Sequence, residues 1–188
     1  MRSYSRNSRR TYSALGVATA VSLLLGSAVQ AGESTHSFVL TAYSNGAGGE
    51  ELLSGNYPAA TEALSHRYTA YSLDASTTSN NRCVVLAVTK QWDSARVACD
   101  RAVRDAQQER TLLPSYQYWG RKLKDDYLAV ALSNRAVLHW LSSDSAAAAT
   151  DLKRAEALSP NADFVARNRA ALEYSRTSVA KVAVVGAH

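Results

Sequence analysis

The sequence predicts an all-α fold of stacked helical hairpins, and a repeated stretch near the C-terminus is the main reason. Asn134-Arg-Ala-Val-Leu and Asn168-Arg-Ala-Ala-Leu stand 34 residues apart. After Asn134, short side chains recur at helical spacing, and Pro160 closes the stretch. Two antiparallel helices approach closely only where side chains are short. A period of this length therefore favours a repeating pair of helices.

The stretch from Asn134 to Pro160 resembles the tetratricopeptide repeat family, whose unit has this period. The resemblance rests on short or apolar side chains at fixed offsets: Ala136, Ala148, Leu152 and Ala155, followed by Pro160. It covers about residues 50–174. It implies a helical repeat domain at 50–177, wound as a short right-handed superhelix of about three hairpins with a C-terminal capping helix. One departure is Ser145, where the family has a corner aromatic residue.

Residues 1–31 are predicted to be a signal peptide. The segment carries four arginines and no acidic residue, then an apolar run from Ala14 to Leu25, then small residues up to Ala31. Cleavage after Ala31 would deliver the chain to the periplasm or outside the cell. The apolar run is short and contains polar residues, so we expect no stable membrane span in the mature chain.

The charge balance after cleavage disfavours nucleic acid as a partner. The whole chain has 21 basic and 16 acidic residues, and removal of 1–31 leaves 17 basic and 16 acidic residues. The mature net charge is therefore +1, without the surplus of cations that binding to phosphate backbones requires.

The mature chain is expected to begin with a flexible entry segment at 32–49, which is polar and rich in glycine. From Glu50 to Leu64 the sequence resembles the end of one repeat helix, a Gly-x-Tyr corner and the start of the next helix. Pro58 fits there, because the first turn of a helix tolerates proline.

A second repeat is predicted to open near Asn80, after a polar linker at 65–78. Its corner at Lys90-Gln-Trp92 corresponds to the corner at Tyr57. In the repeat register, Cys83 and Cys99 lie on facing helices of this hairpin, where a disulfide is geometrically allowed and an oxidising compartment would permit it. The alternative is a pair of small buried thiols.

An insertion at about 107–124 separates the second and third repeats. Pro114 and Gly120 interrupt the helical pattern, so one helix should end before Pro114 and the next should run from near Arg121 to about Leu141. The insertion region mixes aromatic with basic side chains and is either a contact surface or the packing of an irregular connection: Tyr116, Tyr118, Trp119, Arg121, Lys122, Lys124 and Tyr127.

After Pro160, residues 161 to about 174 should form a helix that covers the open end of the array. The apolar tail at 178–188 is either a disordered end or a segment that packs back on the repeats.

Known catalytic and ligand-binding motifs are absent from the sequence. It contains no G-x-S-x-G, no zinc or EF-hand pattern and no phosphate loop. We therefore expect no catalytic, cofactor or metal site, and His139, inside a repeat helix, is interpreted as a groove or core residue.

A binding site is predicted from three asparagines. Asn81, Asn134 and Asn168 occupy the same position of successive first helices, which by the resemblance faces the concave groove. A side-chain amide both donates and accepts, so it can pair with the backbone of an extended peptide of any sequence. The alternative is that these asparagines are solvated polar side chains. By the resemblance, the neighbouring groove positions are Asn80, Val84, Val88, Val130, Ser133, Val137, Trp140, Leu141, Phe164, Arg167 and Tyr174. Of these, Val137, Trp140, Arg167 and Tyr174 join the three asparagines in the predicted peptide-binding or protein-binding set.

The expected function is that of a protein-interaction module, an adaptor or envelope assembly factor that binds a peptide or protein in its concave groove. Two alternatives stay open. One is an envelope enzyme without a recognisable motif, and the other is a structural protein that associates with itself.

Overall fold

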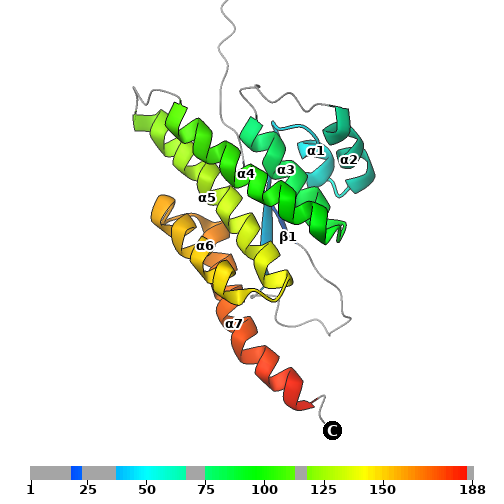
Figure 1. Ribbon diagram of the computed structural model, residues 1–188, viewed down its shortest axis with the longest axis vertical. Helices are drawn as coiled ribbons and strands as arrows, with labels where there is room; N and C mark the ends of the chain where they lie inside the picture. Colours follow the sequence, from blue (N-terminus) through cyan, green and yellow to red (C-terminus); the bar gives the residue numbers. More distant parts are fainter. Residues whose placement is uncertain (1–17, 23–36, 67–74, 113–117, 186–188) are drawn as a thin grey trace, which may run out of the picture.

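The structure of the chain is a computed structural model that describes residues 18–22, 37–66, 75–112 and 118–185. These residues are mostly helical, as predicted (Figure 1). The helices are α1 (Gly49–Leu53), α2 (Tyr57–His66), α3 (Ala75–Val88), α4 (Trp92–Leu112), α5 (Tyr118–Leu141), α6 (Ser145–Leu158) and α7 (Asp163–Val185). Two short strands, β1 (Ala18–Ser22) and β2 (Val39–Tyr43), pair with each other.

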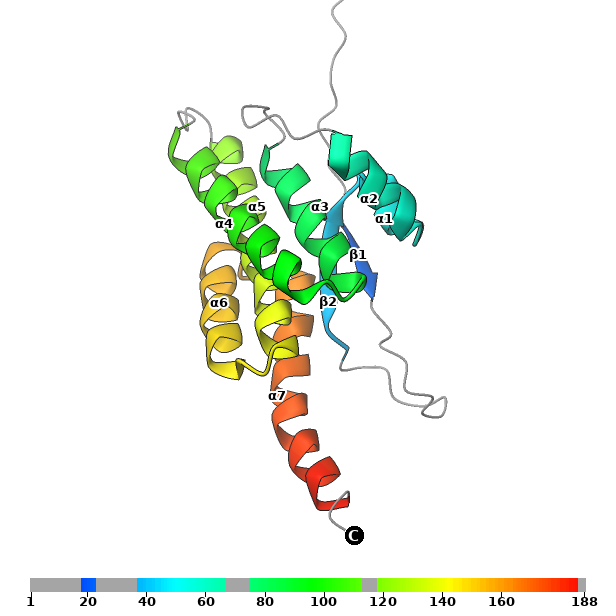
Figure 2. The ribbon, with the colours of Figure 1, turned by 45° about the vertical axis from the view of Figure 1, so that its right-hand side comes forward.

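The helices form hairpins joined by short corners. Helix α1 packs against α2, α3 against α4, and α5 against α6, while α4 also packs against α5. Helix α7 packs on α5 and α6, and its C-terminal end extends past the other helices in both views (Figures 1 and 2). Small side chains such as Ala95, Ala102 and Ala129 are fully buried between these helices. Short side chains therefore let the helices lie close together, as the sequence pattern predicts.

The three corners between paired helices share one backbone conformation. Gly55, Lys90 and Ser143 have φ angles of 78°, 60° and 66°, and each stands two residues before the next helix begins. A positive φ suits glycine and is uncommon for lysine or serine. That two non-glycine residues adopt it indicates that the same turn is imposed at all three places.

Strand β2 is the main difference from the expected fold. Its residues fall in the segment predicted to be a flexible entry, yet all five are buried, with exposures between 0% and 5%. The sequence Val-Leu-Thr-Ala-Tyr is rich in β-branched and aromatic residues, which suit an extended conformation. Helices α3, α5 and α7 lie along β2, so the core of this helical protein contains one strand.

The glycines after β2 make a tight turn into α1. A Cβ atom on Gly49 would lie 1.9 Å from the Tyr43 carbonyl oxygen, and Gly48 has a φ of 68°. Both positions therefore require glycine. The helix after this turn, α1, has only five residues, whereas α3 and α5, the first helices of the two later hairpins, have 14 and 24.

The helices around the insertion agree with the prediction except at one boundary. Helix α4 ends at Leu112, before Pro114, and α5 ends at Leu141. Helix α5 begins at Tyr118, so Gly120 lies inside the helix and does not interrupt it. Residues 113–117 lie outside the described part of the chain.

Two other segments are more helical than expected. Residues 75–78 of the predicted linker form the first turn of α3, where the Ser76 N–H and hydroxyl donate to the Glu109 carboxylate at 2.9 and 2.7 Å. Helix α7 begins at Asp163 and continues through the apolar tail as far as Val185.

Cys83 and Cys99 join α3 to α4 as a disulfide, with their sulfur atoms 2.01 Å apart. Of the two alternatives for these cysteines, the structure therefore has the disulfide. Strand β1 lies within the predicted signal peptide, while the expected cleavage site at Ala31 falls outside the described residues. No helix in the described part of the chain is long and apolar enough to span a membrane.

Candidate functional site: an asparagine ladder along β2

One asparagine from each of three helices points at β2. Asn81 on α3, Asn134 on α5 and Asn168 on α7 are all completely buried. The alternative that these residues are solvated polar side chains is therefore wrong. We call these three residues the asparagine ladder.

Each ladder asparagine makes two hydrogen bonds to one residue of β2. Its Oδ1 accepts from the backbone N–H, and its Nδ2 donates to the carbonyl oxygen of the same residue. Asn168 binds Val39 with distances of 2.6 and 2.9 Å, Asn134 binds Thr41 with 2.8 and 2.8 Å, and Asn81 binds Tyr43 with 2.8 and 2.8 Å. The order of helices reverses the order of the strand, since the first β2 residue meets the last helix.

The ladder asparagines bind the backbone of β2 and make no hydrogen bond to its side chains that would specify its sequence. In an extended chain, alternate residues present their N–H and C=O groups to the same edge, and the ladder binds residues 39, 41 and 43. An amide matches both groups at once. The arrangement can therefore hold an extended segment without specifying its sequence, and here that segment belongs to the chain itself.

A second set of polar side chains links neighbouring rungs of the ladder. Asn134 Nδ2 also donates to Asn80 Oδ1, and Asn168 Nδ2 donates to Ser133 Oγ, both at 2.9 Å. Asn80 and Ser133 each precede a ladder asparagine. Every linking group is buried, so each hydrogen bond replaces a lost contact with water.

Aromatic contacts hold both ends of β2. Phe38, just before the strand, packs on Trp140 of α5 with ring centroids 4.3 Å apart. At the other end, Tyr43 meets Tyr127 edge to face at 5.2 Å. Burial raises the pKa of Tyr43 well above its ordinary value. Its hydroxyl has no hydrogen-bond partner among the described residues.

A scan against family models, a search of curated proteins and a search of solved structures found no match to this chain.

The other predicted binding residues lie at varied distances from the ladder. Val137 is buried in the core at 2% exposure, and Trp140 is half-buried against Phe38. Arg167 lies on α7 with its guanidinium 3.9 Å from the Asp163 carboxylate, and Tyr174 is 49% exposed further along α7. The structure therefore brings Trp140 to the end of β2 and leaves Tyr174 facing solvent.

The insertion contributes packing at one described position. Tyr127 packs against Tyr43 of β2, and Lys122 pairs with Asp126 at 3.3 Å on the surface. Lys124 is buried, whereas Arg121 is exposed. Tyr116 lies outside the described residues, as do the side chains of Tyr118 and Trp119. For Tyr127 the packing interpretation is therefore correct.

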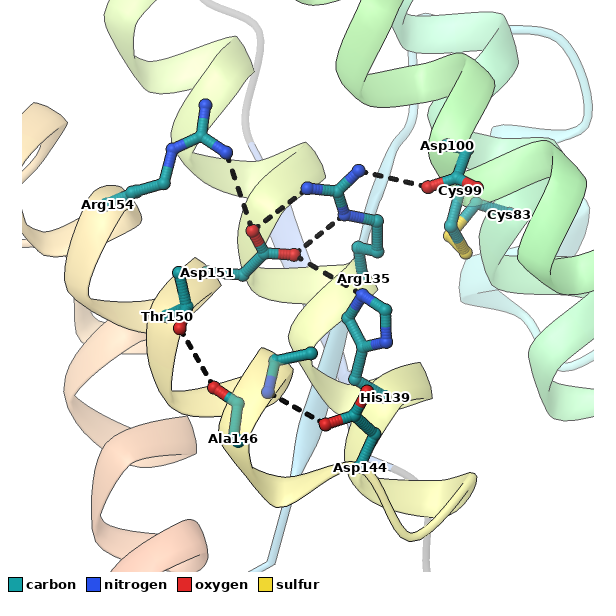
Figure 3. A network of polar contacts seen from close by, with 11 residues as sticks. Cys83, Cys99, Asp100, Arg135, His139, Asp144, Ala146, Thr150, Asp151 and Arg154 are labelled. Atoms are coloured by element: carbon teal, nitrogen blue, oxygen red, sulfur yellow. Dashed lines mark hydrogen bonds and ion pairs between the residues drawn. A yellow bond between two sulfur atoms is a disulfide. The ribbon is translucent and has the colours of Figure 1, made fainter.

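A charged network joins α5 to α4 and α6 through Arg135, the residue after Asn134 (Figure 3). Arg135 donates to both carboxylate oxygens of Asp151 on α6, at 2.7 and 2.9 Å, and to Asp100 on α4 at 3.0 Å. The hydrogen bonds to Asp151 raise the pKa of Arg135 above its ordinary value. This forked contact ties three helices together.

His139 borders the same network. Its Nε2 lies 3.7 Å from Asp151 Oδ2, beyond hydrogen-bond distance, and Asp151 already accepts both bonds from Arg135. In a Ser-His-Asp triad a carboxylate orients the histidine through a hydrogen bond, and Asp151 does not make that bond to His139. Within the described residues, no group of three or more histidine, cysteine or acidic side chains could hold a metal ion.

Sequence reasoning found the ladder asparagines but missed what they bind. The signal for β2 was the run Phe38-Val-Leu-Thr-Ala-Tyr43, in which β-branched and aromatic residues predominate. Asn80 and Ser133 were predicted as groove neighbours, and their hydrogen bonds to Asn134 and Asn168 were not predicted. The partners of Arg135 could not be predicted, because Asp100 and Asp151 are far from it in the sequence.

Proposed function

We propose that the chain is an exported protein-interaction module with a tetratricopeptide-like repeat architecture, and that it binds an extended segment of a peptide or protein partner along its concave face. The observation that carries the proposal is the asparagine ladder, in which three buried amides bind alternate residues of an extended backbone. A face that already organises one extended segment is suited to receive another.

The repeat architecture is supported by features that recur from hairpin to hairpin. The corners at Gly55, Lys90 and Ser143 share a positive φ. Each ladder asparagine is followed by an arginine that reaches back to the preceding helices: Arg82 bonds to Leu64 on α2, Arg135 to Asp100 on α4, and Arg169 to Glu156 on α6. Each first helix thus directs an amide inward and a guanidinium toward the hairpin before it.

Export is supported by two independent features. The N-terminal 31 residues have the order of charged, apolar and small segments that signal peptides share. The Cys83–Cys99 disulfide suits an oxidising compartment such as the periplasm.

The proposed binding face is the one lined by β2 and bordered by Trp140. Aromatic side chains at the edge of a groove are frequent anchors for protein partners, and Trp140 is only half-buried. The exposed corner residue Gln91, between α3 and α4, provides a control position away from this face.

Photo-crosslinking in intact cells tests the proposal. A photoreactive amino acid replaces Trp140 in one variant and Gln91 in another, and adducts are identified by mass spectrometry. We expect a discrete protein adduct from position 140 and none from position 91. Equal labelling at both positions, or no adduct at 140, would contradict partner binding at this face. Mass spectrometry of the purified protein tests export, since we expect a new N-terminus after Ala31.

A further inference from the structure

Strand β2 has two edges with different partners. The ladder binds the backbone of Val39, Thr41 and Tyr43 on one edge. Alternate residues face opposite ways in a strand, so Leu40 and Ala42 present their N–H and C=O groups to the other edge. There β1 runs antiparallel, with Val21 opposite Leu40 and Thr19 opposite Ala42.

The strand that covers this second edge belongs to the segment that export would remove. β1 lies at Ala18–Ser22, upstream of the predicted cleavage after Ala31. In the described structure it packs against β2 and the short helix α1 (Figure 2). Processing would therefore remove the strand that pairs with Leu40 and Ala42 along this edge.

An uncovered edge of this kind is a template for a new strand. Proteins usually protect strand edges with charged side chains, proline or a bulge. The β2 sequence Val-Leu-Thr-Ala-Tyr contains no charged residue and no proline. Its pairing with β1 runs through five consecutive residues without a bulge.

The strand itself is firmly held, so a partner segment would add to it without displacing it. Its ladder edge makes two hydrogen bonds to each of three buried asparagines. Trp140 and Tyr127 pack against the rings at either end. These contacts keep the second edge extended in the absence of β1.

We propose that the processed protein binds an extended, uncharged segment of a partner protein as an antiparallel strand along the second edge of β2, in the position that β1 occupies here. This mode of binding rests on the proposed function and specifies how the partner is recognised. Main-chain hydrogen bonds to Leu40 and Ala42 would provide affinity, as in other cases of strand addition. The partner must have N–H groups opposite these two residues, so proline is excluded at both places. The β1 sequence, Ala-Thr-Ala-Val-Ser, contains small and β-branched residues and no charge, and we expect a partner segment of similar composition.

A peptide with the Ala18–Ser22 sequence, flanked by lysines for solubility and labelled with fluorescein, provides the probe. The full chain is expressed with its own N-terminus and purified after export. Binding of the peptide is followed by fluorescence anisotropy. We expect saturable binding.

Two N-methylated peptides provide a matched pair that leaves the protein unchanged. A methyl group on the Val21 nitrogen removes the N–H that faces Leu40, whereas a methyl group on the Ala20 nitrogen blocks an N–H that faces away from β2. We expect the first peptide to bind at least about ten-fold more weakly than the parent, which corresponds to the loss of about one hydrogen bond. The second should bind like the parent.

Several outcomes would overturn strand addition. One is the absence of saturable binding to the processed protein, and another is equal weakening by both methyl groups. Retention of residues 1–31 in the purified protein would also overturn it, since β1 would then stay in place. A dimer in sedimentation experiments that the peptide dissociates would assign the edge to a second copy of the chain. If position 140 crosslinks a partner while the peptide fails to bind, the proposed function stands and strand addition alone is wrong.

Discussion

Asn134 and Arg135 are neighbours on α5, and their side chains have different partners on different faces of the helix. Asn134 is completely buried and binds the backbone of Thr41 and the side chain of Asn80. Arg135 is part-exposed and binds the carboxylates of Asp151 and Asp100. The first contact requires only an extended backbone, whereas the second requires particular acidic residues on particular helices.

The difference between the partners of Asn134 and Arg135 explains which contacts recur on α3, α5 and α7 and which vary. The ladder position is asparagine on α3, α5 and α7, because each amide meets the same backbone groups. The following arginine also recurs, but its partners change from a carbonyl oxygen for Arg82 to two aspartates for Arg135 and two glutamates for Arg169. The buried asparagine recurs because it always binds the backbone of β2. The partners of the arginine vary because they depend on which side chains the neighbouring helices present.

The largest expected effect is that of Asn134→Ala on the ladder side. The substitution leaves the Thr41 N–H and the Asn80 Oδ1 buried without partners. Each unsatisfied group costs about 1–3 kcal/mol, so we expect the free energy of unfolding to fall by about 3 kcal/mol. Urea denaturation followed by circular dichroism measures it. The exposed Asn161→Ala is the control and should change stability by less than about 0.5 kcal/mol. Equal effects from both substitutions would show that the ladder does not hold β2.

Arg135→Met, on a different face of the same helix, should have a smaller effect. The substitution keeps a long apolar side chain and removes the fork that binds Asp151, a carboxylate with 5% exposure. We expect a loss of about 2 kcal/mol, since hydrogen bonds to charged groups contribute about 1.5–3 kcal/mol. The comparison variant is Arg169→Met, whose ion pairs lie at the surface with a side-chain exposure of 45%. It should change stability by less than about 1 kcal/mol. If the two arginine variants lose the same stability, burial does not distinguish the two sites.

Gly46→Ala sharpens the comparison, because it disturbs one rung of the ladder without removing a hydrogen-bonding group. The new Cβ atom would lie 2.8 Å from Asn81 Nδ2, so Asn81 must shift. We expect a loss of about 1–2 kcal/mol in thermal or urea denaturation. Gly120→Ala in α5 is the matched control, since beyond its chain neighbours and the nearby backbone of its own helix no described heavy atom lies within 4 Å of the new methyl group. Helix propensity there should add up to about 1 kcal/mol of stability. A destabilising Gly120→Ala would contradict this account of the two positions.

The smallest effect is expected from Tyr43→Phe at the end of β2. The hydroxyl is buried without a described partner, so its removal at pH 7 should leave stability unchanged or raise it by less than about 1 kcal/mol. Burial raises the pKa of Tyr43, so the unfolded chain ionises first. The wild-type protein should therefore lose stability as the pH rises above about 10, and the variant should lose less. Stability is measured by urea denaturation between pH 7 and about 11. A clear loss of stability in the variant at pH 7 would indicate that the hydroxyl has a hydrogen-bond partner.

The sequence predicted the parts of this protein that depend on local periodicity. The corner at Trp92, the long helices on either side of Pro114 and the alanine-lined contacts follow from spacing and propensity. The three ladder asparagines were also found, because they recur at one position of the repeat.

The sequence could not predict what depends on contacts between distant segments. The three asparagines that bind β2 lie 38, 93 and 129 positions further along the chain, and the local sequence of β2 does not indicate them. Glycines 46, 48 and 49 were interpreted as a flexible segment, because a glycine run predicts a loop and a tight turn equally well. The tight turn is stabilised by Asn81, whose amide also donates to the Ala47 carbonyl oxygen in that turn.

The direction of β2 has a consequence for synthesis. Its residues leave the ribosome before any of the three helices that bind them, and Val39 meets Asn168 only when nearly the whole chain has been made. Contacts between such distant positions close slowly, because the intervening chain must first be ordered. During elongation this apolar segment is therefore left without the three asparagines that bind its backbone.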